Sequence, residues 1–189
     1  LNSLNIKKIV VVVGYKSKMI KKEIKNKVKF IFYPGFKLKN NLHTLLYIKK
    51  ELNEPLLCLF SDVLFSRKIL QNLLKNQKDM ILAVDKKTRL SGTMRVKIKG
   101  KQVTNIGSHI KTVNADGNFI GFAKFSKKGC KILKKTLINF KNSNLNYYYT
   151  EIFNYLAEKK IYANFIDVSK LNWKEIDTKK DFIQAKKIY

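Results

Sequence analysis

Cysteine is scarce in this 189-residue chain, and its placement excludes two kinds of site. The two cysteines, Cys58 and Cys130, lie in apolar stretches and form neither a Cys-x-x-Cys pair nor a Cys/His spacing. A disulfide framework and a zinc site are therefore not indicated. This cysteine usage is typical of a reducing compartment, so we expect a cytoplasmic protein.

Long apolar runs are also missing. The longest clean run, 9–13, has the length of a strand, whereas a membrane-spanning helix needs ~20 apolar residues. Membrane insertion is therefore not expected. Hydrophobic residues still make up 45% of the chain and aromatic residues 12%, which is enough for a sizeable core and excludes global disorder. No linker or repeat divides the chain, so we expect residues 1–189 to form a single domain.

Acidic residues and arginine are few beside lysine. Asp and Glu number 13 against 40 Lys and Arg, the formal net charge is +27, and all but three of the basic residues are lysines. Proteins that recognise nucleic-acid bases directly favour arginine over lysine, and nucleic-acid-binding modules gather their cationic residues on one face. The lysines of this chain instead spread over the polar faces of periodic segments. We interpret the charge as a lysine-rich solvated surface and do not expect nucleic acid as a partner. A non-enzymatic polyanion-binding basic domain remains the alternative.

Apolar strand patterns alternate with helical patterns through most of the chain. Strands that are apolar throughout indicate burial on both faces, so we predict an α/β fold with a mostly parallel, Rossmann-like sheet and helices on both faces. Shorter segments with glycine turns predict a short antiparallel β insertion. The expected strands are 8–13, 28–32, 56–60, 80–84 and 162–168, with 94–98, 102–106 and 119–125 in the insertion. The expected helices lie around 19–24, at 41–52, 66–76, 126–140 and 149–159, and from 181 onward.

Two acidic residues stand at exposed ends of the predicted elements. Asp62 follows the buried strand 56–60, and Asp177 lies just before the last helix. Ligands bind at the carboxyl ends of parallel strands, and Mg²⁺ takes one or two carboxylates together with phosphate oxygens and water. Asp62 and Asp177 are therefore candidate magnesium ligands. The alternatives stay open, because a strand-end Asp commonly caps a helix or accepts a loop hydrogen bond, and Thr178 to Asp181 has the pattern of a capping box.

Six short motifs, in order, together resemble the nucleotidyltransferase superfamily. They are VVVGY at 11–15, NNL at 40–42, SDVLF at 61–65, AVD at 83–85, NFIGFAKFS at 118–126 and WKEIDTKKD at 173–181. The pattern is most similar to the cytidylyltransferases that act on phosphocholine or 2-aminoethylphosphonate, which resemble sugar-phosphate nucleotidyltransferases. The resemblance covers nearly the whole chain and implies a fold of the nucleotide-diphospho-sugar transferase type.

The resemblance also implies an activity and a set of site residues. The activity is the Mg²⁺-dependent transfer of CMP from CTP to a small phosphorylated or phosphonate acceptor, with release of pyrophosphate. Asp62 and Asp177 would be the catalytic pair that holds Mg²⁺, and Asn41 would lie beside the nucleotide and acceptor phosphates. Trp173 and Glu175 would meet an acceptor amine or quaternary ammonium group. A core tryptophan and a surface acid are the alternative interpretation of these two residues.

Three further points follow from the same resemblance. Glu151 would also face a cationic acceptor, although a helix-surface acid is the alternative. A sugar-1-phosphate nucleotidyltransferase on the same fold is the alternative activity. The family holds the triphosphate in a glycine-rich loop after its first strand. Because Gly14 stands without repeated glycines, we expect that loop to fall before Leu1 and the domain to lack an N-terminal segment.

Overall fold

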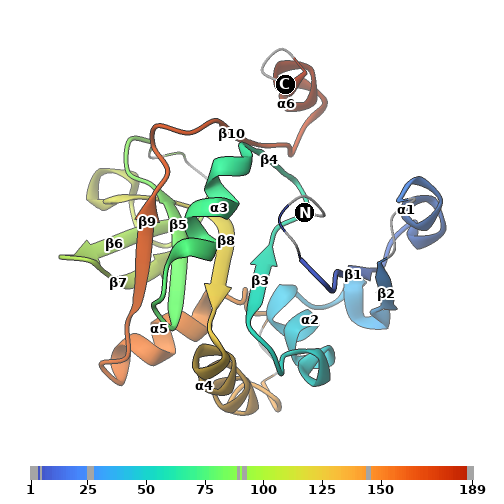
Figure 1. Cartoon of the computed structure of the whole chain (residues 1–189), viewed down its shortest axis with the longest axis horizontal. Helices are drawn as coiled ribbons and strands as arrows, with labels where there is room; N and C mark the ends of the chain where they lie inside the picture. Colours follow the sequence, from blue (N-terminus) through green and yellow to red (C-terminus); the bar gives the residue numbers. More distant parts are fainter. Residues whose placement is uncertain are drawn as a thin grey trace.

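The computed structural model of the chain describes residue 4 and residues 6–24, 28–88, 90, 93–143 and 146–186. Its largest element is a six-stranded sheet in the order β3-β8-β5-β9-β7-β6 (Figure 1). The strands are β3 (Leu56–Leu59), β5 (Met80–Asp85), β6 (Arg95–Lys99), β7 (Gln102–Gly107), β8 (Gly117–Phe125) and β9 (Ala163–Asp167). Each lies where the sequence pattern predicts a strand, with its ends shifted by a few residues.

The sheet is mixed and closed, so the prediction of a mostly parallel, Rossmann-like sheet with a separate antiparallel insertion is wrong. Among the described strands of this sheet, only β5 and β9 pair in parallel. Strand β8 runs antiparallel to β3, β5 and β6, and β7 runs antiparallel to β6 and β9. Because β6 pairs with both β7 and β8, the five strands β5 to β9 close into a barrel.

The error has a physical reason. Strand β5, which was expected in the parallel sheet, is buried along its whole length, yet it is antiparallel to β8 on one side and parallel to β9 on the other. An uninterrupted apolar run therefore indicates that a strand is covered on both faces, which parallel strands usually are, but it does not fix the direction of the neighbours. The strands expected as an insertion, observed as β6, β7 and β8, are in fact three of the five strands of the barrel.

The residues of β5 show how the two faces of the sheet are covered. Successive side chains of a strand point to opposite faces. Met80, Leu82 and Val84 belong to one buried cluster, together with residues of α2, α4 and α5, whereas Ile81 and Ala83 belong to a second cluster with residues of α3. These helices are α2 (Asn41–Tyr47), α3 (Arg67–Lys75), α4 (Lys127–Ile138) and α5 (Glu151–Glu158).

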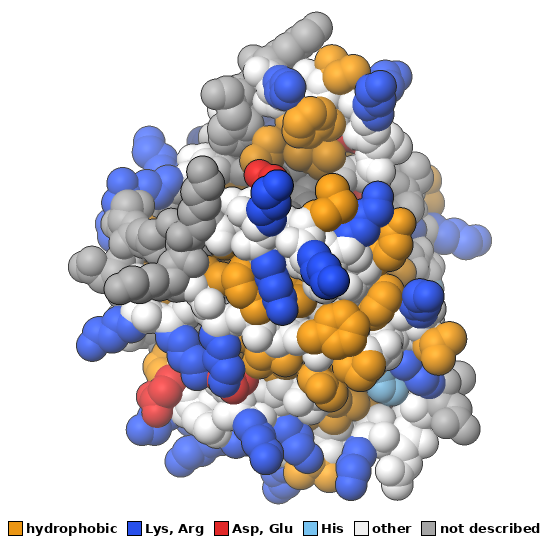
Figure 2. All heavy atoms as spheres, turned by 90° about the vertical axis from the view of Figure 1, so that its right-hand side faces the viewer, with side chains coloured by type: hydrophobic (Ala, Val, Ile, Leu, Met, Phe, Trp, Pro, Cys, Tyr) orange, Lys and Arg blue, Asp and Glu red, His pale blue; other side chains and the backbone are white. Residues whose placement is uncertain are grey.

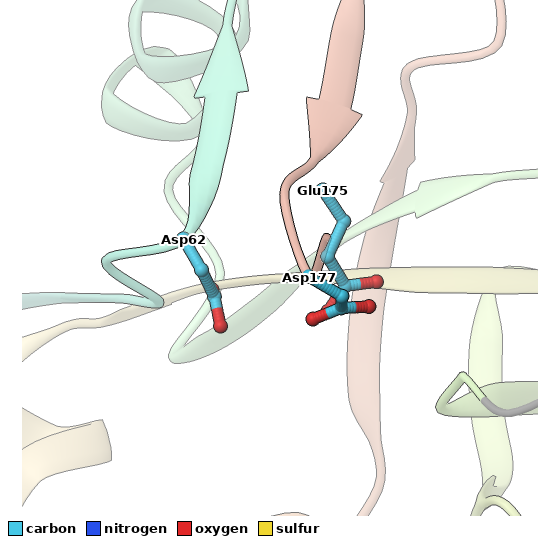
Figure 3. A group of neighbouring side chains, drawn as sticks. All are labelled: Asp62, Glu175 and Asp177. Atoms are coloured by element: carbon cyan, nitrogen blue, oxygen red, sulfur yellow. The ribbon is translucent and has the colours of Figure 1, made fainter. Parts of the chain in front are cut away.

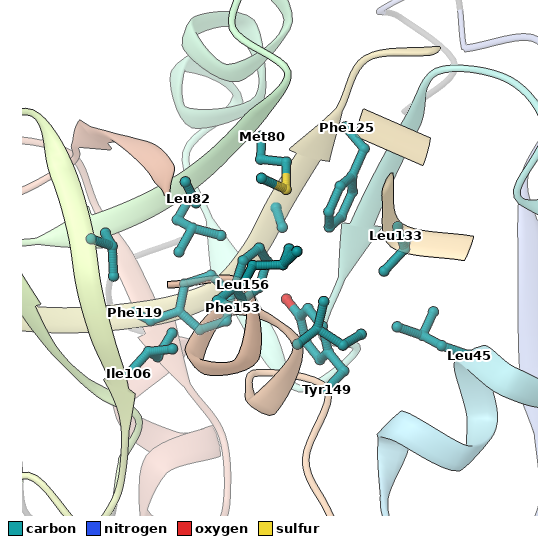
Figure 4. Close-up of a cluster of buried hydrophobic side chains, with 14 of the residues drawn as sticks. Leu45, Met80, Leu82, Ile106, Phe119, Phe125, Leu133, Tyr149, Phe153 and Leu156 are labelled. Carbon is teal, nitrogen blue, oxygen red and sulfur yellow. The ribbon is translucent and has the colours of Figure 1, made fainter. Parts of the chain in front are cut away.

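The larger cluster is the main core of the protein, and Figure 4 shows its side chains converging between the sheet and the helices. Leu45 of α2 and Leu133 of α4 approach it from one side, and Phe153 of α5 lies stacked on Phe125 of β8 with 6.0 Å between ring centroids. Burial of each such side chain contributes roughly 1.5–3 kcal/mol. This core holds the six-stranded sheet in place. Asp62, which follows β3, and Asp85, which ends β5, are positioned by strands of this sheet.

The N-terminal part forms a second, smaller unit. Strands β1 (Val10–Val13) and β2 (Lys29–Phe32) pair in parallel and are connected through α1 (Ser17–Glu23), none of whose residues is buried. Figure 2 looks onto this side of the molecule, where lysine side chains lie scattered between apolar ones and do not gather into one patch. The distribution on this face agrees with a solvated lysine-rich surface more than with a nucleic-acid track.

The remaining elements are short. Short 3-10 turns in the described part of the chain include η2 (Pro34–Lys37), η3 (Lys49–Glu51) and η4 (Thr112–Asn114), and the helix nearest the C-terminus among the described residues is α6 (Lys179–Ala185). The helix expected over 41–52 ends at Tyr47, and η3 follows it. In the described part of the chain, no helix has both the length and the apolar content needed to cross a bilayer.

Candidate active site

Two short strands that the sequence pattern did not predict bring the candidate site together. Strands β4 (Val63–Phe65) and β10 (Trp173–Glu175) form an antiparallel pair in which Glu175 lies opposite Val63. The pairing continues beyond the strands, because the backbone N–H of Ile176 donates to the carbonyl of Asp62 at 2.8 Å. Asp62 therefore precedes one strand, and Asp177 follows the other, at the same end of the pair.

The result is a cluster of three carboxylates, shown in Figure 3. One carboxylate oxygen from each of Asp62, Glu175 and Asp177 lies within 4.8 Å of the others. The carboxyl groups of Glu175 and Asp177 lie next to one another, and the side chain of Asp62 extends toward the same region from the neighbouring strand. Asp62 and Asp177 are exposed, whereas Glu175 is half-buried. The structure thus brings the two predicted magnesium ligands together and adds Glu175 to them.

The electrostatics of this cluster are unfavourable without a bound cation. Burial raises the pKa of Glu175, and the neighbouring carboxylates of Asp177 and Asp62 raise it further. All three potential ligand atoms are carboxylate oxygens, the ligand type that hard divalent cations such as Mg²⁺ prefer. The residues present therefore fit a magnesium ion on the chemistry of the donor set.

The capping alternative for this region applies to Asp181 and not to Asp177. Thr178 caps α6, accepting from the backbone N–H of Asp181 at 3.2 Å, while the Asp181 carboxylate accepts from the backbone N–H of Thr178 at 3.0 Å. Hydrogen bonds from Thr178 and Lys174 lower the pKa of Asp181 to about 2. Asp177 stands outside this capping box, and its carboxylate lies in the cluster.

A pocket of about 480 Å³ opens beside the carboxylate cluster and shares two residues with it. Acidic side chains are concentrated here, although they are rare in the chain as a whole. The pocket is lined by Asp85, Thr88, Leu90, Thr93, Leu171, Asn172, Trp173, Lys174, Glu175, Asp177 and Asp181. We refer to it as the acidic pocket. Trp173, which is half-buried, lines this pocket and also packs against the core cluster of α3.

The other two predicted site residues lie elsewhere. The side-chain oxygen of Asn41, at the start of α2, accepts a hydrogen bond from the backbone N–H of Tyr149 at 2.7 Å. Glu151, in the first turn of α5, accepts from the side chain of Asn154 at 3.1 Å. Neither Asn41 nor Glu151 is among the described residues that line the acidic pocket. Each has a local structural partner, and the predicted substrate-binding roles remain predictions.

Asp85 is a site residue that sequence reasoning missed. It ends β5, is 4% exposed and accepts a hydrogen bond from the indole N–H of Trp173 at 2.9 Å. The available signal was its position, because Asp85 follows an apolar strand just as Asp62 does. The partner could not be foreseen, since Trp173 lies on a strand that the sequence pattern did not indicate.

Solved structures share this fold over nearly the whole chain. The CTP:phosphocholine cytidylyltransferase from Streptococcus pneumoniae matches with a TM-score of 0.77 and 15% identity, over 100% of this chain and 81% of that one. The inositol-1-phosphate CTP transferase from T. maritima matches with a TM-score of 0.70 and 16% identity, over 91% of this chain and 71% of that one. A UDP-glucose pyrophosphorylase matches with a TM-score of 0.68 and 15% identity, over 96% and 80% of the two chains.

The chain has a nucleotidyltransferase fold. The resemblance inferred from the six ordered motifs is thereby confirmed at the level of the fold. No family model and no curated protein matches the sequence. At these identities the likeness shows the fold alone, and the reaction has to be argued from the residues of this chain.

Proposed function

We propose that the protein transfers CMP from CTP to a small phosphorylated or phosphonate acceptor and releases pyrophosphate. The observation that carries the proposal is the convergence of Asp62, Glu175 and Asp177 at one end of the β4–β10 pair. The nucleotidyltransferase fold supports it, and two structures that share the fold are named as CTP-dependent transferases.

Asp62 and Asp177, with Glu175 beside them, would hold the magnesium ion. When bound, Mg²⁺ would neutralise negative charge on the phosphoryl oxygens of the nucleotide and the acceptor. In the reaction, an oxygen of the acceptor phosphate or phosphonate forms a bond to the α-phosphorus of CTP. The bond from that phosphorus to the β-phosphate bridging oxygen breaks, and the electron pair leaves with pyrophosphate. The protein forms no covalent bond to the substrates, so its contribution is positioning and charge compensation.

The acidic pocket supports an acceptor that carries a positive charge. Four carboxylates line it, those of Asp85, Glu175, Asp177 and Asp181, against one cationic lining residue, Lys174, which pairs with Asp181 at 3.1 Å. Trp173 adds an aromatic surface in the same pocket, and an indole is the most favourable partner for an ammonium group. Phosphocholine combines a quaternary ammonium group with a phosphate, and 2-aminoethylphosphonate combines a protonated amine with a phosphonate. Each matches this combination of residues.

Pyrophosphate release from CTP tests the proposal, with Mg²⁺ and with phosphocholine and 2-aminoethylphosphonate as separate acceptors. Wild-type protein is expected to release pyrophosphate with at least one of them. Asp62→Asn and Asp177→Asn keep the shape of the side chain and remove its charge. Each is expected to lower turnover by at least on the order of a hundredfold, because loss of even an outer-shell partner of a metal costs ~10–100-fold.

The matched control for these variants is Asp116→Asn, in which the same change is made at a half-buried aspartate outside the acidic pocket. Turnover by Asp116→Asn should equal that of the wild type. Unchanged turnover in Asp62→Asn or Asp177→Asn would refute the metal assignment.

A sugar-1-phosphate nucleotidyltransferase is the second candidate function. The observation that favours it is the shared fold with a UDP-glucose pyrophosphorylase. The same assay separates the two, with UTP, dTTP and glucose-1-phosphate added to the panel. Faster turnover with a sugar-1-phosphate than with either amine-bearing acceptor would favour this second function.

A further inference from the structure

Asp85 is a buried carboxylate whose hydrogen bonds connect two separate parts of the acidic pocket. One carboxylate oxygen accepts from the indole N–H of Trp173, on β10, at 2.9 Å. The other accepts from the backbone N–H groups of Lys87 and Thr88, in the segment after β5, at 2.8 and 3.2 Å. Burial opposes ionisation of Asp85, but the bonds from Trp173 and this backbone outweigh it and lower the pKa of the carboxyl.

The two parts that Asp85 connects belong to different segments of the chain, and both line the acidic pocket. Trp173 and Glu175 come from β10, whereas Thr88, Leu90 and Thr93 come from the segment between β5 and β6. Asp85 and Trp173 themselves are 88 positions apart in the chain. A charged acceptor with three donors at hydrogen-bond distance holds its partners more firmly than a neutral one.

The consequence concerns the indole ring. Two χ angles determine where the ring of Trp173 lies, and a hydrogen bond at Nε1, in the five-membered ring, restrains rotation about both of them. The ring is then held against the α3 core cluster and the acidic pocket together, two residues before Glu175. An aromatic surface binds a cation well only when its face is held in a fixed place near the cation.

We propose that Asp85 is a positioning residue for acceptor recognition, which acts by holding the indole of Trp173 in the wall of the acidic pocket. The inference rests on the proposed function, since it concerns the same pocket. It assigns to Asp85 no contact with the reacting atoms.

Trp173 is the one tryptophan of the chain, so its fluorescence reports on this ring alone. The first measurement is acrylamide quenching of the free protein, without nucleotide, metal or acceptor. Asp85→Ala should raise the quenching constant, because the ring loses its hydrogen bond and becomes more accessible. Asp167→Ala is the matched control: Asp167 also ends a strand of the sheet and accepts from a nearby backbone N–H, but does not line the acidic pocket. It should leave the quenching constant unchanged.

The second measurement is calorimetric binding of phosphocholine and of 2-aminoethylphosphonate. Asp85→Ala should weaken binding of the preferred acceptor about tenfold, the effect of losing one hydrogen bond to a charged group, with the affinity for Mg²⁺ and CTP unchanged. Trp173→Phe, which has no ring N–H, should weaken acceptor binding to a similar extent. In the Trp173→Phe background, Asp85→Ala should cause little further loss, because its effect passes through Trp173.

Each contrary result has a distinct meaning. A quenching constant that stays at the wild-type value in Asp85→Ala overturns the positioning role, as does an additive loss of acceptor affinity in the double variant. If Asp85→Ala does not fold, Asp85→Leu, which fills the space of the side chain but has no hydrogen-bond acceptor, takes its place in both measurements with the same criteria. If the wild-type protein binds neither acceptor, both the proposed acceptor and the role of Asp85 in recognising it are overturned. Raised quenching in Asp85→Ala would still show that Asp85 holds the ring of Trp173, so the two failures can be told apart.

Discussion

Removing the charge of Glu175 should stabilise the metal-free protein, although it deletes a side chain of the proposed site. Glu175 is half-buried, and one of its carboxylate oxygens lies within 4.8 Å of oxygens of both Asp62 and Asp177. Like charges at this separation repel, and Glu175→Gln removes both of its repulsive pairs while keeping nearly the same volume. The variant should therefore unfold at a higher temperature when no divalent cation is present.

The size of the effect follows from Coulomb's law. At 4.8 Å, two unit charges repel by about 0.9 kcal/mol in bulk water and about 3.5 kcal/mol at an effective permittivity of 20. Asp62 and Asp177 are exposed, so screening by water brings each pair toward the lower value. Two pairs then give about 1–2 kcal/mol in the free energy of unfolding, which for a chain of this size raises Tm by roughly 2–8 °C.

The pH dependence of the effect has a definite sign. Because the folded state raises the pKa of Glu175 above its value in the unfolded chain, ionisation of Glu175 destabilises the fold. The wild type has its full stability below the unfolded pKa, near ~4.3, and loses it as the pH rises through the higher folded value. The stability advantage of Glu175→Gln should therefore be present at neutral pH and vanish in acid.

Thermal unfolding followed by circular dichroism, with EDTA at neutral and at acidic pH, measures this effect. Glu54→Gln, the same change at an exposed glutamate outside the acidic pocket, is the control and should stay within about 0.5 kcal/mol of the wild type. Saturating Mg²⁺ should stabilise the wild type more than Glu175→Gln, because binding to the folded state alone raises Tm. A Tm for Glu175→Gln in EDTA at neutral pH that equals or falls below that of the wild type would refute the argument.

Two further predictions concern stability away from the site. Glu51 accepts from Lys29 at 2.5 Å and from Lys8 at 2.6 Å, and these bonds lower its pKa to about 2. Glu51→Gln should therefore lower Tm at neutral pH, and the difference in Tm should shrink as the pH falls from the pKa of Glu51 in the unfolded chain toward 2. A difference in Tm that does not change with pH would contradict the ion-pair explanation. At Gly129, in the first turn of α4, an added Cβ would lie 2.1 Å from the carbonyl oxygen of Asp79. Gly129→Ala should therefore lower the free energy of unfolding, measured by chemical denaturation, by about 1–3 kcal/mol. A higher free energy of unfolding, from the greater helix propensity of alanine, would show that the contact relaxes without cost.

The sequence predicted where most strands and helices lie, because those elements are encoded by local periodicity. The pattern of β5 is an example: every residue from Met80 to Val84 is apolar, and each is buried. Direction and closure are different properties, since they depend on pairings between distant segments. Nothing in the residues of β6 indicates that it pairs with β8 as well as with β7, and that pairing is what closes the barrel.

The candidate site was predictable in part for the same reason. Asp62 and Asp177 could be selected from their positions beside an apolar strand and a terminal helix, and the structure places them together. Glu175 could be selected as a site residue, but its place beside the two aspartates depends on the β4–β10 pair, whose strands are too short to give a periodic signal. The contact between Asp85 and Trp173 depends on where the β4–β10 pair places Trp173 relative to the end of β5, and it has no local signature.

Binding of CTP in the presence of Mg²⁺ tests the central claim most directly, because it does not depend on the choice of acceptor. Calorimetric titrations of the wild type, of the double variant Asp62→Asn/Asp177→Asn and of Asp116→Asn compare the carboxylate cluster with an aspartate that does not line the acidic pocket. The account predicts Mg²⁺-dependent binding of CTP by the wild type and Asp116→Asn, and its loss in the double variant. Equal affinity in all three proteins, or no dependence on Mg²⁺, would contradict the assignment of Asp62 and Asp177 as the metal and nucleotide site.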